Sequence, residues 1–493
     1  MNTATWFVVL PLVTAPLVYA VGRVPMPADT RVQRLVSART FSLGIVAALW
    51  LLYLRLSAIY WGQGTLSVQF GQAGFYVDGL SLLFMSLSLV MGTLVILYSA
   101  LFIRDAEQNT EKYYASLIVM IGATFGFACA GDVFNLWIWY EVVVIASCFP
   151  LVFYTDESGS LEAGVKYLVQ SALGSVLIVL GIALILAQVG TLDLQEIRVQ
   201  ASSSEPLIAA AVLFTTGFGI KLGIVPLHTW IPDAYSQAPD AIAAMFSSII
   251  SKIGLIALLR LAIALEAAIL SWGMLLIILG VVNIFFGNLF AYSQQQVKRL
   301  LAYSSISHIG YIMLGLGIGI HFGDPTGLQG GLLHLITHAL MNGLAFMAVG
   351  VLAFSLHTRA PVINDYRGMA WRFPFTALAL TTALLSLGGI PPLAGFISKL
   401  QILLPGLTSD SPLVIGLVIF AGINSVLSLV YYLRIVNALF YTPAPDVEQT
   451  RIPLLAQLPL AILTVLLLVL GILPMLVTPM IDAVARAFWP VGG

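Results

Sequence analysis

Lysines inside long apolar stretches are the residues of this sequence whose chemistry first needs an explanation. Four of the six lysines lie in such stretches: Lys166, Lys221, Lys252 and Lys399. A charged side chain inside a bilayer is costly, so residues of this kind usually mark an ion or proton path. Burial can bring the pKa of a lysine toward neutrality, and the side chain can then bind and release a proton, which an arginine does not do. The four lysines therefore predict a proton relay.

Among the 22 acidic residues, Glu141 alone lies well inside a predicted membrane span with apolar residues on both sides. A carboxylate in such surroundings needs a partner, and Lys221 and Lys166 are the candidates closest in type. One alternative is a carboxyl group that stays protonated and hydrogen-bonded in a packed bundle. We expect Glu141 to be an ionisable member of the charge pathway.

Histidines add further polar points to the apolar stretches. His334 and His338 are four residues apart, which places them on one face of a helix. This pattern favours a polar path, with a packed structural pair as the alternative. A haem or metal site is disfavoured because a second pair of ligands on a facing helix is missing from the six histidines. His228 is a candidate member of the same path, and His308 adds another polar point.

Two predicted spans contain prolines that interrupt a helix, and each has a lysine beside the break. Pro226 follows Lys221 in one span, and Pro391 and Pro392 precede Lys399 in the other. Interrupted helices in matching halves of a membrane protein are typical of an ion site near the midplane. A kink used only for packing remains the alternative. We expect both breaks to belong to the pathway.

The composition of the chain excludes most soluble classes of protein. Of the 493 residues, 60% are hydrophobic and 9% charged, against about a quarter charged in ordinary soluble domains. The 21 basic and 22 acidic residues nearly cancel, so a nucleic-acid partner is not expected. Cys129 and Cys148 are too few for an iron–sulfur cluster, a zinc site or a disulfide framework. We expect no metal and no cofactor in this chain.

The apolar runs predict an all-α polytopic membrane protein with about fourteen transmembrane helices. The first run, from Trp6 to Tyr19, lacks a basic leader and is interpreted as a span rather than a signal peptide. The predicted spans are 4–22, 37–60, 78–103, 113–131, 132–154, 160–188, 207–231, 241–265, 267–292, 299–320, 329–356, 372–405, 411–440 and 452–476.

Basic residues in the predicted loops give the orientation, because cytoplasmic loops are enriched in lysine and arginine. One side has twelve: Arg23, Arg31, Arg34, Arg39, Arg104, Lys112, Lys298, Arg299, Arg359, Arg367, Arg372 and Arg451. The other side has three: Arg198, Arg260 and Arg486. Both termini are therefore expected on the non-cytoplasmic side.

Several ordered motifs resemble the antiporter-like membrane subunits shared by respiratory complex I and the multisubunit Mrp cation/proton antiporters. They are the segment from Lys221 to Asp233, the segment Ser248 to Gly254, the loop Gln296 to Ser305, and the segment Gly388 to Phe396. The segments from Leu161, His338 and Asp365 are most similar to subunit N of complex I. The segment Asp132 to Leu136 and the surroundings of Tyr235 are more similar to the Mrp D subunit.

The resemblance implies three N-terminal helices in residues 1–112, a first antiporter-like repeat in 113–265, a second, inverted repeat in 266–440, and a final helix and tail in 441–493. Each five-helix repeat has one broken helix. In the family, a glutamate pairs with a lysine on the first broken helix and further lysines pass the proton on, which matches Glu141, Lys221, Lys252 and Lys399. Some relatives have a lysine where this chain has Asn342.

The resemblance and the buried charges together predict a proton-translocating subunit of a multisubunit complex of the complex I type. Its expected partners are other hydrophobic subunits, membrane lipid and protons, with sodium as a second candidate ion. No dinucleotide fingerprint or Walker loop is present, so redox chemistry would belong to partner subunits. The alternatives are an Mrp D-type antiporter subunit, a membrane subunit of a related hydrogenase, and a stand-alone solute carrier. The expected location is a bacterial or archaeal plasma membrane or another energy-transducing membrane.

Overall fold

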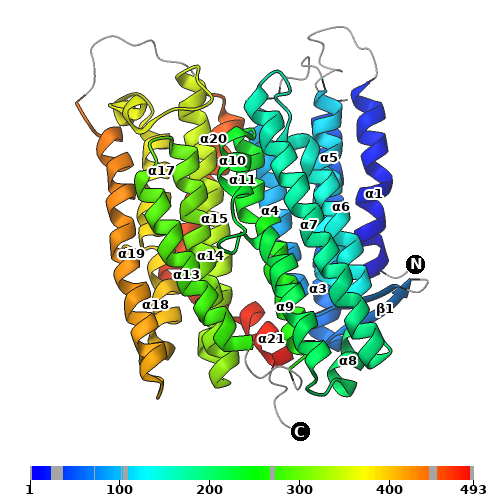
Figure 1. Cartoon of the computed structure of the whole chain (residues 1–493). Helices are drawn as coiled ribbons and strands as arrows, with labels where there is room; N and C mark the ends of the chain where they lie inside the picture. Colours follow the sequence, from blue (N-terminus) through cyan, green and yellow to red (C-terminus); the bar gives the residue numbers. More distant parts are fainter. Residues whose placement is uncertain are drawn as a thin grey trace. The chain divides into compact units, whose positions relative to one another are not determined.

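The computed structural model describes residues 3–23, 37–70, 73–100, 103, 109–266, 272–442 and 452–488. Helices make up most of this part of the chain (Figure 1). Twelve described helices are long and apolar enough to cross a membrane, and three shorter apolar helices cover Trp6–Gly22, Pro374–Gly388 and Ala394–Leu407. The all-α membrane class is therefore confirmed, whereas the total of fourteen spans stays a prediction.

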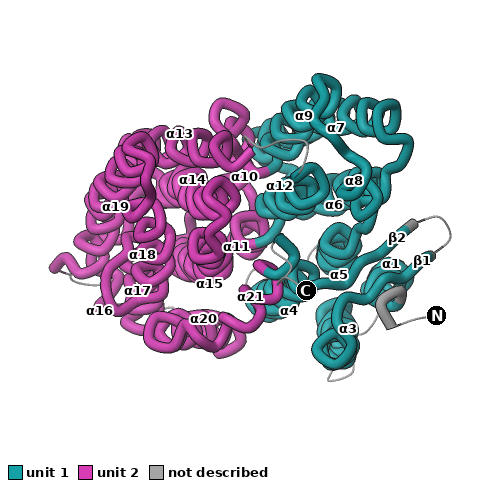
Figure 2. Tube along the Cα trace, turned by 90° about the horizontal axis from the view of Figure 1, so that it is seen from below, with its two compact units in different colours: residues 1–221, 249–269, 486–493 teal, residues 222–248, 270–485 magenta. Residues whose placement is uncertain are grey.

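The chain divides into two compact units (Figure 2). Unit 1 comprises Met1–Lys221, Ile249–Ile269 and Arg486–Gly493, and unit 2 comprises Leu222–Ser248 and Leu270–Ala485. The segment Leu222–Ser248, which the sequence assigns to the first repeat, thus groups with the second half of the chain. The assignment of two inverted repeats stays a prediction.

Unit 1 consists of helices and one β-hairpin, which the sequence analysis did not predict. Strands β1 and β2 pair antiparallel, with Leu66 opposite Val77. Directly after β2, Asp78 caps the next helix and accepts a hydrogen bond from the backbone of Ser81. The elements are α1 (Thr3–Gly22), α3 (Ala38–Gln63), β1 (Leu66–Phe70), β2 (Ala73–Val77), α4 (Gly79–Ser99), α5 (Thr110–Cys129), α6 (Val133–Leu151), α7 (Ser158–Val189), α8 (Leu194–Gln200), α9 (Glu205–Leu222, whose last residue begins unit 2), η1 (Ile250–Lys252) and α12 (Ile253–Ala264).

Glycine residues allow helices α13 and α14 of unit 2 to pack closely against each other. A Cβ atom added to Gly310 would lie 2.5 Å from the carbonyl oxygen of Gly280, so only glycine permits this approach. The elements are α10 (Trp230–Gln237), α11 (Asp240–Ser248), α13 (Trp272–Ser293), α14 (Val297–Phe322), α15 (Pro325–Ser355), η2 (Ile363–Tyr366), α16 (Met369–Arg372), α17 (Pro374–Gly388), α18 (Ala394–Leu407), α19 (Pro412–Leu439), α20 (Leu454–Ile472), η3 (Pro474–Leu476) and α21 (Thr478–Phe488, whose last residues belong to unit 1).

Helices end at both of the proline-containing segments. After α9, Gly223 adopts a positive φ of 83°, and after α17, Gly389 adopts one of 81°. This conformation ends a helix, and glycine adopts it without a steric penalty. Pro226 follows the first glycine, and Pro391 and Pro392 follow the second. Each break therefore leaves helix-end backbone groups that need partners.

Candidate functional site

In unit 1, Lys221 belongs to a series of hydrogen-bonded side chains that come from three helices. The Lys221 ammonium is fully buried at the end of α9 and donates a hydrogen bond to the hydroxyl group of Tyr167 on α7. The Tyr167 oxygen lies 2.5 Å from the Ser147 hydroxyl on α6, and both of these residues are fully buried. The Tyr167 ring also lies 4.1 Å from the lysine nitrogen. The arrangement can bind a proton at Lys221 and exchange it with neighbouring hydroxyl groups.

Glu141 lies on α6, the helix that also carries Ser147. Its Oε1 atom is buried and has no hydrogen-bond partner within the described ranges. Glu141 and Lys221 interact electrostatically. The structure thus brings these two predicted partners into one cluster, and Glu141 retains an oxygen that can accept a proton.

Lys252 is a further buried cation of unit 1. It ends the short 3₁₀ turn η1 and is fully buried. The apolar stretch Asp240–Ala264 that contains it is buried throughout its most apolar window. Turns of this kind inside helices often mark functional positions. The role of Lys252 in a proton relay stays a prediction.

Unit 2 contains a hydrogen-bonded series of buried side chains. The Tyr432 hydroxyl lies 3.2 Å from His308 Nε2, and His308 Nδ1 lies 3.0 Å from His334 Nε2. His334 Nδ1 then lies 2.8 Å from the Ser398 hydroxyl. His338 stacks on His308, with ring centroids 4.9 Å apart. Because an imidazole can donate through one nitrogen and accept through the other, the series can pass a proton from α19 to α18.

Asn342 extends the polar region of unit 2 without adding charge. Its Nδ2 atom lies 3.1 Å from His338 Nε2 and donates to the Ser305 hydroxyl at 2.5 Å. All three residues are buried. Asn342 is therefore a neutral group that contacts His338 within this polar region.

Lys399 follows Ser398 in α18 and is 4% exposed. Its ammonium donates to the carbonyl oxygen of Leu387, at 2.8 Å, and to the Ser425 hydroxyl, at 2.9 Å. The Tyr311 ring lies 4.9 Å from the same nitrogen. Leu387 is in the last turn of α17, where carbonyl groups lack an intrahelical donor and attract positive charge. Lys399 therefore binds the helix end at the second break.

Asn283 on α13 binds the first break, and sequence reasoning missed this residue. Its Oδ1 atom accepts from the Val225 backbone at 2.8 Å, and its Nδ2 atom donates to the Gly223 carbonyl at 3.2 Å. His228, in the same break, stacks against Phe290 with centroids 5.9 Å apart. The structure thus places His228 outside the series that joins His308 and His334.

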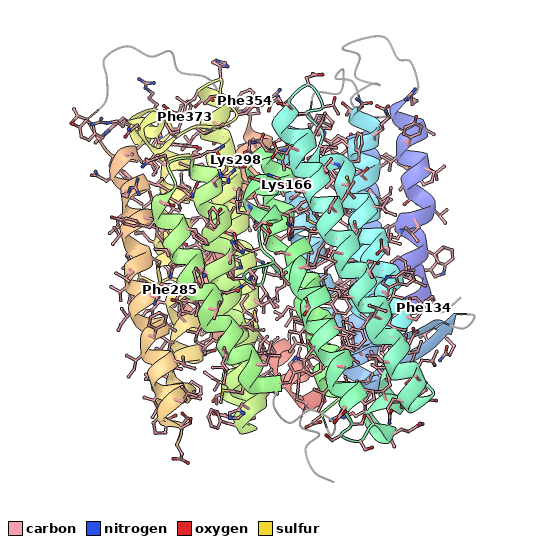
Figure 3. The ribbon with its side chains drawn as sticks, viewed as in Figure 1. Phe134, Lys166, Phe285, Lys298, Phe354 and Phe373 are labelled. Carbon is pink, nitrogen blue, oxygen red and sulfur yellow. The ribbon has the colours of Figure 1, made fainter. Side chains whose placement is uncertain are left out.

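Lys166 does not have the buried position expected of a pathway residue. Its side chain is 43% exposed and forms an ion pair with Glu162 at 2.7 Å, one turn earlier on α7 (Figure 3). The helical period turns Lys166 outward, while the next residue, Tyr167, points inward and binds Lys221. The prediction of Lys166 as a pathway residue does not agree with this placement.

Two basic residues that the sequence analysis counted as loop charges are buried. Lys298, near the start of α14, is 3% exposed (Figure 3), and its Nζ atom lies 3.1 Å from Oδ1 of Asp240. Arg260, within α12, is 6% exposed, and its Nη1 atom lies 3.1 Å from Oδ2 of Asp78. Both residues occur near the ends of apolar stretches, where sequence alone does not separate a loop position from a buried one.

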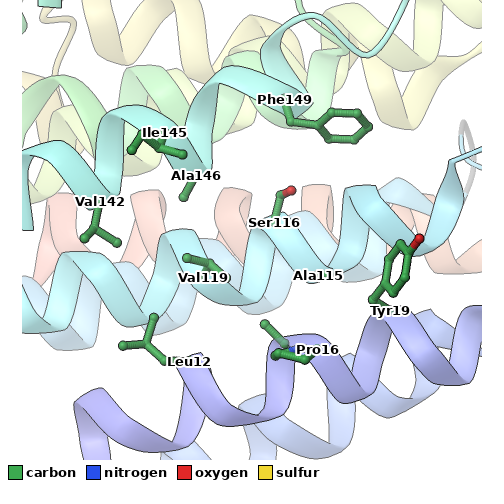
Figure 4. A pocket seen from close by; sticks show the side chains of 11 residues that line it. Leu12, Pro16, Tyr19, Ala115, Ser116, Val119, Val142, Ile145, Ala146 and Phe149 are labelled. Atoms are coloured by element: carbon green, nitrogen blue, oxygen red, sulfur yellow. The ribbon is translucent and has the colours of Figure 1, made fainter. Parts of the chain in front are cut away.

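A groove of about 520 Å³ lies between α1, α5 and α6 (Figure 4). Apolar side chains such as Leu12, Val119 and Phe149 line it, together with Tyr19 and Ser116. None of the predicted pathway residues lines this groove. Among the described residues, no group of three or more histidine, cysteine or acidic residues is placed to hold a metal ion. The candidate site is therefore the set of buried charges and hydroxyls.

Most residues of the candidate site lie in a segment of the chain that matches a known family. Residues 130–428 match the family model described as NADH:quinone oxidoreductase/Mrp antiporter, transmembrane. The chain belongs to this family. All of the predicted pathway residues lie in the matching segment, and the resemblance found in the sequence is confirmed.

Individual members of the family are similar over most of their length. NADH-quinone oxidoreductase subunit N of Desulforamulus reducens is 32% identical over 89% of this chain and 90% of that protein. F(420)H(2) dehydrogenase subunit N of Methanosarcina mazei is 30% identical over 81% of this chain and 82% of that protein. Among solved structures, a chain of the membrane-bound sulfane sulfur reductase, an archaeal respiratory membrane complex, aligns with a TM-score of 0.88 and 26% identity over 99% of this chain and 98% of that chain.

Proposed function

We propose that this chain is a proton-translocating, antiporter-like subunit of a multisubunit membrane complex of the complex I type. The single observation that carries the proposal is the hydrogen-bonded group of Lys221, Tyr167 and Ser147, with the buried oxygen of Glu141 nearby. A path for protons needs groups that bind and release them in succession, and these side chains provide such groups away from solvent.

In the proposed mechanism, Glu141 and Lys221 are the coupling pair of unit 1. An ionised Glu141 favours a protonated Lys221, and neutralising the carboxylate favours release. Tyr167 and Ser147 exchange protons with the lysine, and Lys252 accepts the proton next. Each proton transfer changes the charge beside the next group and so changes the proton affinity of that group. A charge change at one end of the series therefore alters proton binding along the whole series.

Unit 2 carries the second set of proton-transfer groups. His334 and His338 accept and donate protons together with His308, and Lys399 serves as the last group of the path. Lys399 must exchange its bond to the Leu387 carbonyl for another acceptor whenever it releases a proton. At the second break, release of a proton from Lys399 is therefore proposed to coincide with a change in its hydrogen bond to the end of α17.

The driving reaction is proposed to reside in partner subunits, and this chain is proposed to hold no cofactor. The relatives named as N subunits of quinone-linked and F(420)H(2)-linked dehydrogenases support a redox-driven complex. The family description also includes Mrp antiporters, which supports a D-type antiporter subunit that exchanges sodium for protons as the second candidate. A related hydrogenase complex is the third.

Purification of the complex through a tag on this chain tests the proposal. We expect hydrophobic subunits together with flavin- or iron-containing subunits, and proton uptake into proteoliposomes when the redox substrate is added. Proton uptake driven by a sodium gradient, with hydrophobic partners alone, would support the antiporter alternative. A complex that moves no protons under either condition would contradict the proposed function.

The proposed orientation places both termini on the non-cytoplasmic side. Ile363 in the predicted loop is buried, but its neighbour Asn364 is exposed. A cysteine in place of Asn364, in a chain whose Cys129 and Cys148 are replaced by alanine, should react with an impermeant thiol reagent only from the cytoplasmic face. Thr30, in a predicted loop on the same side, lies outside the described residues. Reaction of the Asn364 variant from the opposite face would reverse the orientation.

A further inference from the structure

Unit 1 contains a buried ion pair that the proposed proton path does not use. Arg260 on α12 donates to both carboxylate oxygens of Asp78, at 3.1 and 3.2 Å. It also donates to the Ser81 hydroxyl, at 2.8 Å, and to the carbonyl oxygen of Ala128. A guanidinium with these partners is held in one place between α12, α4 and the end of α5.

Asp78 remains ionised in this arrangement. Burial acts to raise the pKa of Asp78, but the Arg260 charge and the hydrogen bonds from Ser81 outweigh it, so its pKa lies below the ordinary value of 3.8. Arginine keeps its proton at any physiological pH. The pair is therefore a fixed plus and minus charge rather than a proton carrier.

A cavity of about 220 Å³ ends at this ion pair. Thr65, Gln195 and Arg198 line it together with Asp78 and Arg260, so it is large and polar enough to hold water. Arg198 is 33% exposed and pairs with Glu266 at 3.1 Å. The cavity thus offers water a route up to Arg260 from the end of unit 1 that carries the β-hairpin.

On the other side of the ion pair, the same helical stretch leads to Lys252. Arg260 lies eight positions after Lys252, which corresponds to about 12 Å along a helix. The residues between them are apolar or glycine, and all are buried. A proton that left Lys252 in this direction would meet the ion pair before it met the cavity.

We propose that Arg260, held by Asp78, seals this end of unit 1 against protons, so that a proton on Lys252 does not escape through the cavity. This inference rests on the proposed proton-transport function. A fixed cation repels protons and other cations, as arginines do in selective pores. Asp78 holds the cation in place and limits the cost of its burial, since removal of one partner leaves an uncompensated charge.

Passive proton leak through the assembled complex in proteoliposomes tests the seal. Arg260→Met leaves Asp78 as a lone carboxylate that attracts water and protons. We expect leak down an imposed pH gradient, without driving substrate, to rise about tenfold, the effect of one unit charge at about 12 Å with an effective dielectric constant of about 20. Asp78→Asn keeps the cation, so its leak should stay at the wild-type level or below.

The different changes in leak expected for Arg260→Met and Asp78→Asn distinguish a seal from a role of the ion pair in packing alone. Arg198→Met is the matched control, because it removes a cation from the same cavity but leaves the buried pair intact. Equal leak in Arg260→Met and Asp78→Asn, or no leak in either, would overturn the proposal. Failure of the wild-type complex to move protons when driven would instead refute the proposed function, and the two failures are measured separately.

Cysteine labelling tests the seal even if Arg260→Met does not assemble. In a chain with Cys129→Ala and Cys148→Ala, a cysteine at Ile263, which lines the cavity, should react with a small hydrophilic thiol reagent. A cysteine at Ile256, on the Lys252 side of Arg260, should be protected. Reaction at both positions would show that water passes the ion pair and would overturn the proposal.

Discussion

Lys221 and Lys399 each lie beside a broken helix, but their nitrogen atoms bind different kinds of group. Lys221 donates to the hydroxyl of Tyr167, which can itself pass on a proton. Lys399 donates to the carbonyl oxygen of Leu387, which has no proton to exchange, and to Ser425. We therefore propose different tasks for the two lysines: proton exchange at the first break, and proton exchange combined with binding of a helix end at the second.

The partners of the two breaks explain how this difference arises. At the first break, Asn283 both accepts from Val225 and donates to Gly223, so a neutral side chain satisfies the helix-end groups. At the second break, Lys399 supplies a donor itself. In the proposed mechanism, Asn283 therefore binds the helix end at the first break, whereas Lys399 both exchanges a proton and binds the helix end at the second.

Arginine and methionine variants of the two lysines give the largest expected effects. Lys221→Met and Lys221→Arg should each lower driven proton flux by a factor of roughly 100, because proton exchange at a positioned group contributes on that scale and arginine does not release its proton. Lys399→Met should block turnover, and Lys399→Arg should fail nearly as badly. Flux is measured in the assembled complex.

The arginine variants also test the proposed difference between Lys221 and Lys399. Assembly is checked by co-purification of the partner subunits. Substantial activity in Lys399→Arg, together with an inactive Lys399→Met, would mean that Lys399 only binds the Leu387 carbonyl. The same pattern at Lys221 would remove its role in proton exchange.

Removal of single hydroxyl groups should have an intermediate effect. Tyr167→Phe deletes the group that joins Lys221 to Ser147, and we expect a loss of proton flux of roughly fivefold, equivalent to one buried hydrogen bond of about 1 kcal/mol. Tyr432→Phe should have a smaller effect, because His308 keeps its contact with His334. Proton flux at several substrate concentrations provides the measurement. A larger loss in Tyr432→Phe than in Tyr167→Phe would reverse the assigned importance of the two sets.

Lys166→Gln should have the smallest effect. The half-exposed Lys166 side chain forms an ion pair with Glu162 on the surface of α7, and exposed ion pairs contribute about 0–1 kcal/mol. We expect a change in proton flux of less than about twofold. Lys221→Gln, which removes the same charge at a buried position, is the matched control. A loss in Lys166→Gln equal to that of the control would restore Lys166 to the pathway.

The sequence was sufficient to find part of the buried charges, because charged residues in the middle of apolar stretches are rare and conspicuous, whereas Lys298 and Arg260 near the ends of such stretches were counted as loop charges. Glu141, Lys221, Lys252 and Lys399 all stand out in this way. It did not identify Tyr167, because hydroxyl groups are common in membrane helices and only the rotation of α7 distinguishes Tyr167 from Lys166.

The remaining misses concern contacts between distant segments. Asn283 lies 58 residues from Val225, and Arg260 lies 182 residues from Asp78. No local spacing indicates either pair. The hairpin of β1 and β2 is short and falls between the predicted spans 37–60 and 78–103, in a segment for which the sequence analysis predicted no element.

Proton flux in Glu141→Gln tests the central claim most directly, because this change removes an ionisable group while it keeps the size of the side chain. In the assembled, driven complex, the account predicts that Glu141→Gln loses most proton transport, that Glu141→Asp keeps part of it, and that Glu162→Gln, on the exposed face of α7, behaves as wild type. Wild-type proton flux in Glu141→Gln would contradict the account.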